Sequence, residues 1–353
     1  MVRDFWRPQT LLRRDQKLAI YMQGAVLHDA GGKMGFGILR YSPNPISCII
    51  DSDSAGQSAR ELTGIPRDVP IVATVQEAFA LGADAFVLGI APAGGLIPSD
   101  WYPVIDEVVR RGLSVVNGLH DLLGPRYGEL APGQFVWDIR VEPEGLAPGT
   151  GAAAALRNRR LLLIGTDMAV GKMTAGLEIY RVAREKGIDA EFIATGQIGI
   201  TVTGAGVPLD AIRVDFAGGA IEREVLRARE ADLVIVEGQG SLIHPSSTAN
   251  LPLLRGSCPT HLILCLKAGQ SHLRNNPHIR IPPMGDFIRL YESLASACGT
   301  YPTPKTVGIA INTIGLSDDE AQIMSAQIES EIGLPVTDPV RNGPSRLLDA
   351  VMA

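Results

Sequence analysis

The sequence has few aromatic residues and no long run of basic or of apolar residues. Phe, Trp and Tyr make up 5% of its 353 residues, and the formal net charge is -6. Proteins that bind nucleic acid usually carry a basic patch, often with aromatic side chains that stack on bases, so we expect no nucleic-acid partner. No stretch approaches the roughly 20 apolar residues that cross a bilayer, so we expect no membrane partner either.

A signal-peptide core and a paired-cysteine motif are also missing. Residues 1–6 are charged and lack the apolar segment of a secretory leader, which predicts a cytoplasmic protein. The cysteines form no CxxC pair, so we expect neither a metal site nor a redox motif. They are Cys48, Cys258, Cys265 and Cys298, and we expect all four to be free, buried thiols.

What the sequence does contain is a repeated alternation of short apolar runs with helical patterns. This alternation predicts buried parallel strands connected by helices, which is an α/β fold. A cluster of proline, glycine and alanine divides the chain, so we expect a linker at residues 146–155 between doubly wound domains at 1–145 and 156–353. Strands are expected at 17–21, 46–50, 71–73, 85–90, 113–116, 160–164, 191–194, 233–236, 261–266, 307–311 and 335–337, and helices at 101–111, 172–186 and 222–229.

The second half opens with a glycine-rich loop between an expected strand and an expected helix. Glycines let the backbone N–H groups of such a loop point at an anion, and the helix N-terminus and Lys172 add positive charge. This order of elements predicts a phosphate site in a domain like those of P-loop NTPases. The predicted binding residues are Gly165, Thr166, Val170, Gly171, Lys172, Met173 and Thr174.

The loop departs from the usual nucleotide-binding pattern at one position. Met173 follows the lysine where Ser or Thr normally ligates Mg²⁺, and Thr174 comes one residue late, which on a helix turns its side chain by about 100°. The departure argues against a site for hydrolysis of a Mg-nucleotide. The form of residues 165–172 nevertheless resembles the loop of dethiobiotin synthetase and its relatives.

Polar residues follow the expected strands of the second half, where ligands of open α/β sheets bind. Glu237 can act as a base or bind an ammonium group, or it can pair with Lys172 or cap a helix. His244 can transfer protons or belong to a turn. Asp167 is a further candidate for the base, and Ser241 or the N–H groups of a glycine turn can stabilise an oxyanion.

Further polar residues near the strand ends are candidates for substrate binding. They are Gln197, Gln239, Lys267 and Asp215. Lys267 can hold a carboxylate or be merely solvated. Asp215 and Glu222 can position a substrate or cap a helix that we expect to begin near Gly219.

The first half resembles the Rossmann-like, CoA-binding domain of succinyl-CoA synthetase. The resemblance is carried by residues 69–78, 83–92 and 112–120. Asp51 follows a strand, where it would suit a ribose hydroxyl. Residues 31–37 are rich in glycine and contain Lys33, so this segment can meet a phosphate or form a flexible turn.

The whole chain is similar to the D-glutamate N-acetyltransferase family, formerly a family of unknown function with a Rossmann-like and a P-loop domain. Residues 33–41, 165–174 and 236–245 carry the similarity. The resemblance implies transfer of an acetyl group from acetyl-CoA to the amine of D-glutamate, both small-molecule substrates. It agrees with the loop, because the phosphates of CoA suit a phosphate site that lacks the magnesium-binding hydroxyl.

Two other functions remain open from the residues. One is an ATP-dependent carboxylate-activating ligase or kinase similar to dethiobiotin synthetase, with Lys172 on the phosphates and Thr174 or Asp167 near Mg²⁺. The other is a module that senses a nucleotide or CoA without turnover. Base rates for enzymes of this size favour a symmetric homo-oligomer in each case.

Overall fold

The computed structural model describes residues 11–26, 31–92 and 94–353. The charged residues 1–6 therefore lie outside the described part. The chain forms two compact units, the first made of residues 1–142 and 197–211 and the second of residues 143–196 and 212–353. The chain thus enters the second unit, returns to the first for fifteen residues, and then leaves it again.

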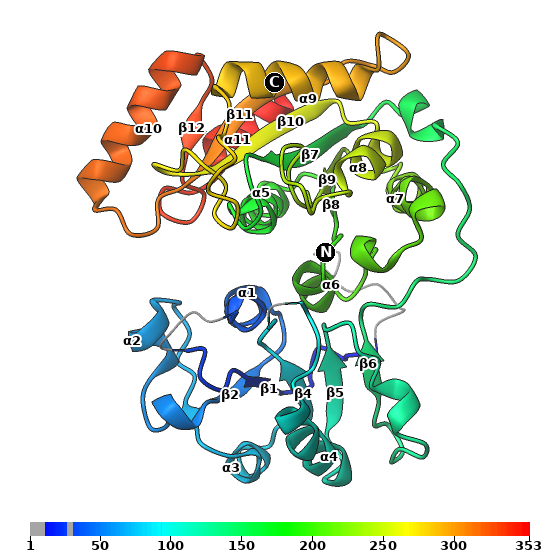
Figure 1. Ribbon diagram of the computed structural model, residues 1–353, viewed down its shortest axis with the longest axis vertical. Helices are drawn as coiled ribbons and strands as arrows, with labels where there is room; N and C mark the ends of the chain where they lie inside the picture. The colour runs from blue at the N-terminus through cyan, green and yellow to red at the C-terminus, as the bar shows by residue number, and fades with distance from the viewer. Residues whose placement is uncertain (1–10, 27–30, 93) are drawn as a thin grey trace. The chain divides into compact units, whose positions relative to one another are not determined.

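The first unit is built on a parallel sheet with the strand order β3-β2-β1-β4-β5-β6. This order is that of a doubly wound Rossmann-like sheet and confirms the predicted fold class. Its central strands are fully buried, as their continuous apolar sequences require (Figure 1). The strands are β1 (Leu18–Tyr21), β2 (Ile46–Ile50), β3 (Ile71–Val72), β4 (Ala85–Leu88), β5 (Ser114–Asn117) and β6 (Val136–Asp138).

Helices cover both faces of this sheet. α1 packs on β1 and β4, while α3 and α4 pack on β2 and β5. The expectation of a flexible turn at residues 31–37 is wrong, because helix α1 begins at Lys33 and buries two glycines. The alternative, that this segment meets a phosphate, stays a prediction. The helices are α1 (Lys33–Tyr41), α2 (Ala59–Thr63), α3 (Val75–Ala80) and α4 (Tyr102–Arg110).

Helix α6 (Gln197–Thr203) belongs to the first unit although it follows a strand of the second. It packs against α1 (Figure 1). Gly199, Ile200 and Val202 are buried. Ile200 and Val202 are each 4% exposed. The short helix therefore groups with the first unit through its packing on α1.

The second unit is built on another parallel sheet, with the order β12-β11-β10-β7-β9-β8. The first strand in sequence, β7, lies between β10 and β9, so the strand order reverses beside it. Ligands of open sheets bind at such a reversal, beyond the carboxyl ends of the strands. The strands are β7 (Arg159–Gly165), β8 (Ala190–Ile193), β9 (Leu233–Val236), β10 (His261–Lys267), β11 (Lys305–Asn312) and β12 (Val336–Thr337).

The helices of the second unit also divide between the faces of its sheet. α5 and α11 pack together on β7 and β11, and α7 packs on α8 (Figure 1). Among the described residues, no helix is both long and apolar enough to cross a membrane. The helices are α5 (Lys172–Glu185), α7 (Val214–Arg227), α8 (Asn250–Ser257), α9 (Met284–Ser296), α10 (Asp318–Ile332) and α11 (Ser345–Met352).

Helix α7 corrects a prediction about Asp215 and Glu222. It begins at Val214 instead of near Gly219, so neither carboxylate caps a helix starting at that glycine. Glu222 is buried, and its Oε2 accepts hydrogen bonds from the N–H (2.7 Å) and Oγ1 (3.0 Å) of Thr150. The carboxylate therefore fixes the proline- and glycine-rich linker to α7 instead of facing a substrate.

Candidate active site

The glycine-rich loop joins the carboxyl end of β7 to the first turn of α5, as the sequence predicts. Gly171 ends the loop with a φ of +105°, a conformation that favours glycine. Lys172 is 6% exposed, and its Nζ donates a hydrogen bond to the carbonyl oxygen of Asp167 (2.8 Å). The N–H groups of the first helical turn have no carbonyl partner within the helix, so this end of α5 attracts an anion.

The end of β9 lies against β7 and the lysine of the loop. A Cβ atom at Gly238 would be 1.6 Å from the carbonyl oxygen of Leu163 and 2.9 Å from Cδ of Lys172. Only glycine fits this position. The close approach brings the carboxylate of the preceding residue, Glu237, to the buried lysine.

Glu237 is a buried carboxylate with two backbone hydrogen bonds. Its Oε2 accepts from the N–H groups of Thr195 (2.9 Å) and Gly196 (3.2 Å), while Oε1 lies 3.5 Å from Nε2 of Gln239. Burial raises the pKa of Glu237 to about 7, although these N–H groups and the charge of Lys172 act to lower it. The carboxyl group is therefore buried close enough to Lys172 for its charge to act on the pKa of Glu237.

His244 and Asp167 face each other beside the loop. Nε2 of His244 lies 4.0 Å from Oδ1 of Asp167, and both side chains are buried. The N–H of Ser246 donates to Nδ1 of His244 (3.1 Å), which in the neutral ring places the proton on Nε2, toward Asp167. Because Nδ1 already accepts a hydrogen bond, this arrangement suits His244 as a neighbour that orients Asp167 better than as a base.

Thr166 and Ser241 connect the loop to the segment after β9. Oγ of Ser241 donates to the carbonyl oxygen of Thr166 (3.1 Å), so the predicted oxyanion donor is already engaged. Oγ1 of Thr166 is buried and has no hydrogen-bond partner among the described residues. A buried hydroxyl without a partner is unfavourable, so its presence in the loop points to a ligand that completes it.

Asp167 is fixed by two residues that the sequence did not single out. Its Oδ2 accepts from Nε2 of Gln270 (2.6 Å) and from the N–H of Arg274 (2.8 Å), and its Oδ1 accepts from the N–H of Met168 (2.6 Å). Gln270 follows a core strand within the segment where Lys267 was chosen instead. The position of the Gln270 side chain just after a strand could have indicated that it belongs to the site. Arg274 contacts Asp167 through its backbone N–H, which any residue type except proline has, so the sequence gives no indication of that contact.

The remaining predicted residues lie in different places. Val170 is buried within the loop, and Met173 and Thr174 are half-buried in the first turn of α5. Lys267 is exposed at the end of β10, and Asp215 is exposed in the first turn of α7. Gln197 begins α6 and so belongs to the first unit, where its Cγ lies beside Gly118.

The carboxylate of Asp51, in the first unit, accepts hydrogen bonds from neighbouring turns of the protein. It is fully buried, its Oδ1 accepts from the N–H groups of Gly24 (2.9 Å) and Asp53 (3.2 Å), and its Oδ2 accepts from Oγ of Ser54 (2.9 Å). These bonds hold the turns after β1 and β2 together. The carboxylate is therefore engaged by the protein itself instead of being presented to a ribose.

The thiols are free, but not all of them are buried. Cys48, Cys258 and Cys265 are buried, whereas Cys298 is exposed, contrary to the expectation for all four. Cys265 lies on β10, and its carbonyl oxygen accepts from the N–H of Thr166 in the loop. Burial raises the pKa of the Cys265 thiol to about 12, so the cysteine beside the loop stays protonated and is a poor nucleophile.

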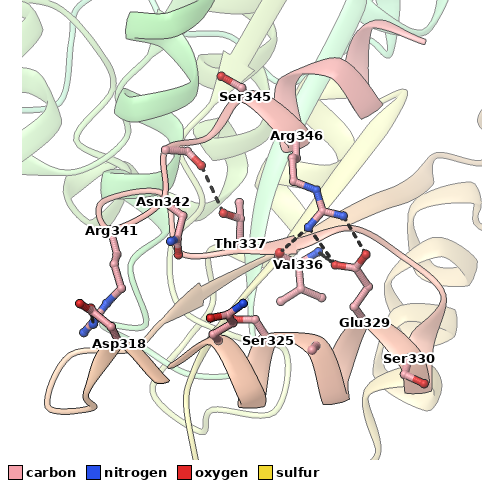
Figure 2. Close-up of a pocket in the computed structure, with 13 residues that line it drawn as sticks. Asp318, Ser325, Glu329, Ser330, Val336, Thr337, Arg341, Asn342, Ser345 and Arg346 are labelled. Carbon is pink, nitrogen blue, oxygen red and sulfur yellow. Dashed lines mark hydrogen bonds and ion pairs between the residues drawn. The ribbon is translucent and has the colours of Figure 1, made fainter. Parts of the chain in front are cut away.

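A groove of about 790 Å³ lies elsewhere in the second unit, along β12 between α10 and the segment before α11. Figure 2 shows Arg346 bonded to Glu329, with an Nη2–Oε1 distance of 2.7 Å, and Arg341 beside its partner Asp318. Both arginines that line the groove are thus paired with carboxylates of the protein. The groove offers no free charge for a ligand, so the loop region is the better candidate site.

The sequence matches two family models. Residues 52–142 match the N-terminal Rossmann-like domain, and residues 147–348 the C-terminal P-loop domain, of DUF1611, each described as a domain of unknown function. The second range contains all six strands of the second sheet, whereas the first begins after β2 and contains β3 to β6 of the first sheet. The glycine-rich loop and Glu237 both fall within the P-loop domain.

Similar proteins include two curated relatives and one solved structure. Proteins named D-glutamate N-acetyltransferase from a Pseudoalteromonas species and from Tritonibacter scottomollicae are each 36% identical, over 79% of this chain and 83% and 84% of their own lengths. The crystal structure of a DUF1611 family protein from Anabaena variabilis is 48% identical, with a TM-score of 0.92 over 96% of this chain and 99% of that one.

Proposed function

Because the chain belongs to the DUF1611 family, the acyltransferase family of the D-glutamate N-acetyltransferases, we propose that it transfers the acetyl group of acetyl-CoA to the amine of D-glutamate. The observation that carries the proposal is the pairing of a phosphate-binding loop with a buried carboxyl group. Glu237 has a pKa of about 7 and lies near Lys172 of the loop. Acetyl transfer to an amine needs both features, an anchor for the phosphates of CoA and a base.

The loop fits the phosphates of acetyl-CoA. The N-terminus of α5 and Lys172 supply positive charge, and the Oγ1 of Thr166 lacks a partner that a phosphate oxygen would provide. Met173 stands where a nucleotide-hydrolysing enzyme needs a hydroxyl for Mg²⁺. Binding of CoA phosphates needs no such ligand, and so this residue supports CoA over a nucleoside triphosphate.

Glu237 is the base in this mechanism. The amine of the amino acid is mostly protonated at neutral pH, so Glu237 first removes one proton from the ammonium group, and the freed lone pair of the nitrogen then attacks the thioester carbonyl. A second proton passes from the nitrogen to the departing sulfur, and Glu237 releases its own proton to solvent. The new C–N bond forms, the C–S bond breaks, and the CoA thiolate leaves with a proton. A base whose pKa lies near 7 suits this exchange, since both of its protonation states are populated at neutral pH.

The neighbouring groups favour direct transfer to the amine. A covalent acetyl-enzyme would need a nucleophile beside the loop, but the pKa of Cys265 is raised to about 12 and Oγ of Ser241 is bonded to the backbone. Asp167 and His244 lie 4.0 Å apart, and each accepts a hydrogen bond from a backbone N–H group. We therefore assign this pair to holding the loop in shape rather than to the chemistry.

The proposal is tested by incubating the protein with D-glutamate and acetyl-CoA and measuring the release of free thiol. We expect release with D-glutamate, and a fall of about 100-fold or more in kcat for Glu237→Gln, the size typical of losing a general base. Binding of CoA by this variant, measured by calorimetry, should persist. Glu230→Gln is the matched control, because that carboxylate is exposed near the end of α7 and should leave kcat unchanged.

Three results would contradict the proposal. Thiol release that Glu237→Gln leaves unchanged would remove this residue from the chemistry. Absence of thiol release, together with Mg-dependent consumption of ATP in the presence of a carboxylic acid, would instead favour the ligase or kinase function. Tight binding of CoA without any product would favour a sensing module.

A further inference from the structure

A short hairpin of residues 271–281 follows Gln270 and lies next to the phosphate-binding loop. His272 pairs with Arg280 in an antiparallel bridge. The N–H of Leu273 donates to the carbonyl oxygen of Ile279 (3.0 Å), and the N–H of Ile281 donates to that of Ser271 (2.9 Å). We call residues 271–281 the basic hairpin.

The two faces of the basic hairpin differ in character. Side chains alternate between faces along a strand, and residues paired across strands share a face. Leu273 is 1% exposed, and Ile279 and Ile281 are half-buried. His272, Arg274 and Arg280 are exposed, so one face packs on the protein while the other presents two guanidinium groups and an imidazole to solvent.

The exposed face carries no acidic side chain of its own. The sequence contains no Asp or Glu from residue 261 to residue 285. Within the described part of the chain, neither Arg274 nor Arg280 forms an ion pair with a carboxylate. The arginines of the groove beside β12 differ in this respect, because each of them is paired.

The basic hairpin is fixed to the loop through Asp167. Nε2 of Gln270 donates both to Oδ2 of Asp167 (2.6 Å) and to the carbonyl oxygen of His272 (2.9 Å). The N–H of Arg274 donates to the same Oδ2 (2.8 Å). The cationic face is therefore held at a set position beside the site instead of moving freely.

We propose that the basic hairpin binds the carboxylates of an amino dicarboxylic acid, with Arg274 and Arg280 as its ligands. The inference rests on the proposed function. In that function the loop binds the phosphates of acetyl-CoA, and the binding site of the amino acid that accepts the acetyl group is still unassigned. That reactant carries two carboxylates and one amine. Two arginines without partners match the carboxylates, since a guanidinium binds a carboxylate through paired hydrogen bonds.

The test measures kinetics of Arg274→Gln and Arg280→Gln. Each change raises the KM for D-glutamate about tenfold or more, because a charge-assisted contact is lost, and leaves the KM for acetyl-CoA unchanged. Arg280→Lys retains part of the affinity. Arg289→Gln is the matched control, because that exposed arginine on α9 is paired with Asp286. Melting temperatures confirm that each variant is folded.

The outcomes separate this inference from the proposed function. If the KM for acetyl-CoA rises and that for D-glutamate does not, the hairpin binds the donor and the inference is overturned. If the native protein releases no thiol with D-glutamate, the proposed function fails by itself. Calorimetry with glutarate then decides: binding to the native protein that is lost when both arginines are replaced by Gln supports the inference, and equal binding or none overturns it.

Discussion

Burial and hydrogen bonding act on Glu237 in opposite directions. Removal from water raises the pKa of the carboxyl group, while the N–H groups of Thr195 and Gly196 and the charge of Lys172 lower it. Burial dominates, and the resulting pKa of about 7 lies above the ordinary value of 4.5. A carboxyl group in this balance exchanges its proton near neutral pH, but its ionised form costs stability.

This balance predicts how stability depends on pH. The pKa of Glu237 is raised in the folded state. Its contribution to the free energy of unfolding is therefore complete below pH 4.5 and is lost as the pH rises through about 7. The difference between the folded-state and ordinary pKa values of Glu237 corresponds to about 3 kcal/mol of unfolding free energy. Urea unfolding should therefore show the stability of the native protein, relative to Glu237→Gln, falling by about that amount between about pH 5 and about pH 7.5.

The control for this prediction is Glu230→Gln, which removes an exposed carboxylate. Its stability relative to the native protein should be nearly independent of pH over the same range. A constant difference between the native protein and Glu237→Gln would show that the carboxyl group titrates in the folded protein at its ordinary pKa.

Single residues at strand ends could be predicted from the sequence, and their partners could not. The places of Lys172 after β7 and of Glu237 after β9 follow from apolar strands that end in glycine-rich segments, while their roles stay predictions. The bonds of Asp167 to Gln270 and Arg274 join residues more than 100 positions apart. The orientation of His244 likewise depends on the N–H of Ser246, which no residue pattern reveals.

At the scale of elements, the junction between β9 and β7 depends on Gly238. The missing side chain lets the end of β9 pass the carbonyl oxygen of Leu163 and the stem of Lys172. A methyl group here would have to displace backbone, which is far less adaptable than the end of a side chain. The position of Glu237 relative to the loop therefore depends on this glycine.

We expect Gly238→Ala to lower the free energy of unfolding by about 3 kcal/mol or more. Chemical denaturation measures the loss. Gly218→Ala is the matched control, since a Cβ atom there meets nothing within 4 Å and the residue lies within helix α7. Alanine at 218 should leave stability unchanged or raise it by up to about 1 kcal/mol. Equal effects of the two changes would refute the packing argument.

Elements with a clear apolar pattern could be predicted from the sequence, and glycine-rich helices could not. The core strands were located to within one or two residues, because continuous apolar runs bounded by polar residues are typical of buried parallel strands. α1 and the first turns of α7 were missed, since glycines weaken a helix in isolation. Here the glycines allow close packing, as Gly35 does against Met22 and Gly219 against the linker.

At the scale of the whole molecule, the chain passes between the two units more than once, because residues 197–211 return to the first unit. α6 packs on α1 of the first unit, although it is encoded between strands of the second. The sequence predicted two domains and a proline- and glycine-rich connection between them. It could not predict this return, because the pattern of residues 197–203 does not indicate which sheet they pack on.

A fragment of residues 1–142 should therefore be less stable than the same fragment joined by a flexible linker to residues 197–211. Burial of Ile200 and Val202 is worth about 1.5 to 3 kcal/mol for each side chain. Thermal unfolding followed by circular dichroism compares the two fragments. The control carries Asp at both positions and should melt like the shorter fragment. Identical melting temperatures for all three would show that α6 contributes nothing.

The return of α6 also limits how this gene can recombine. A single crossover in the linker, at residues 143–155, would join the first sheet of one parent to an α6 encoded by the other. The hybrid would then contain a mismatched core at the contact between α6 and α1. Exchange of halves between distant relatives is thereby penalised, so the two halves should share one evolutionary history instead of being shuffled as separate modules.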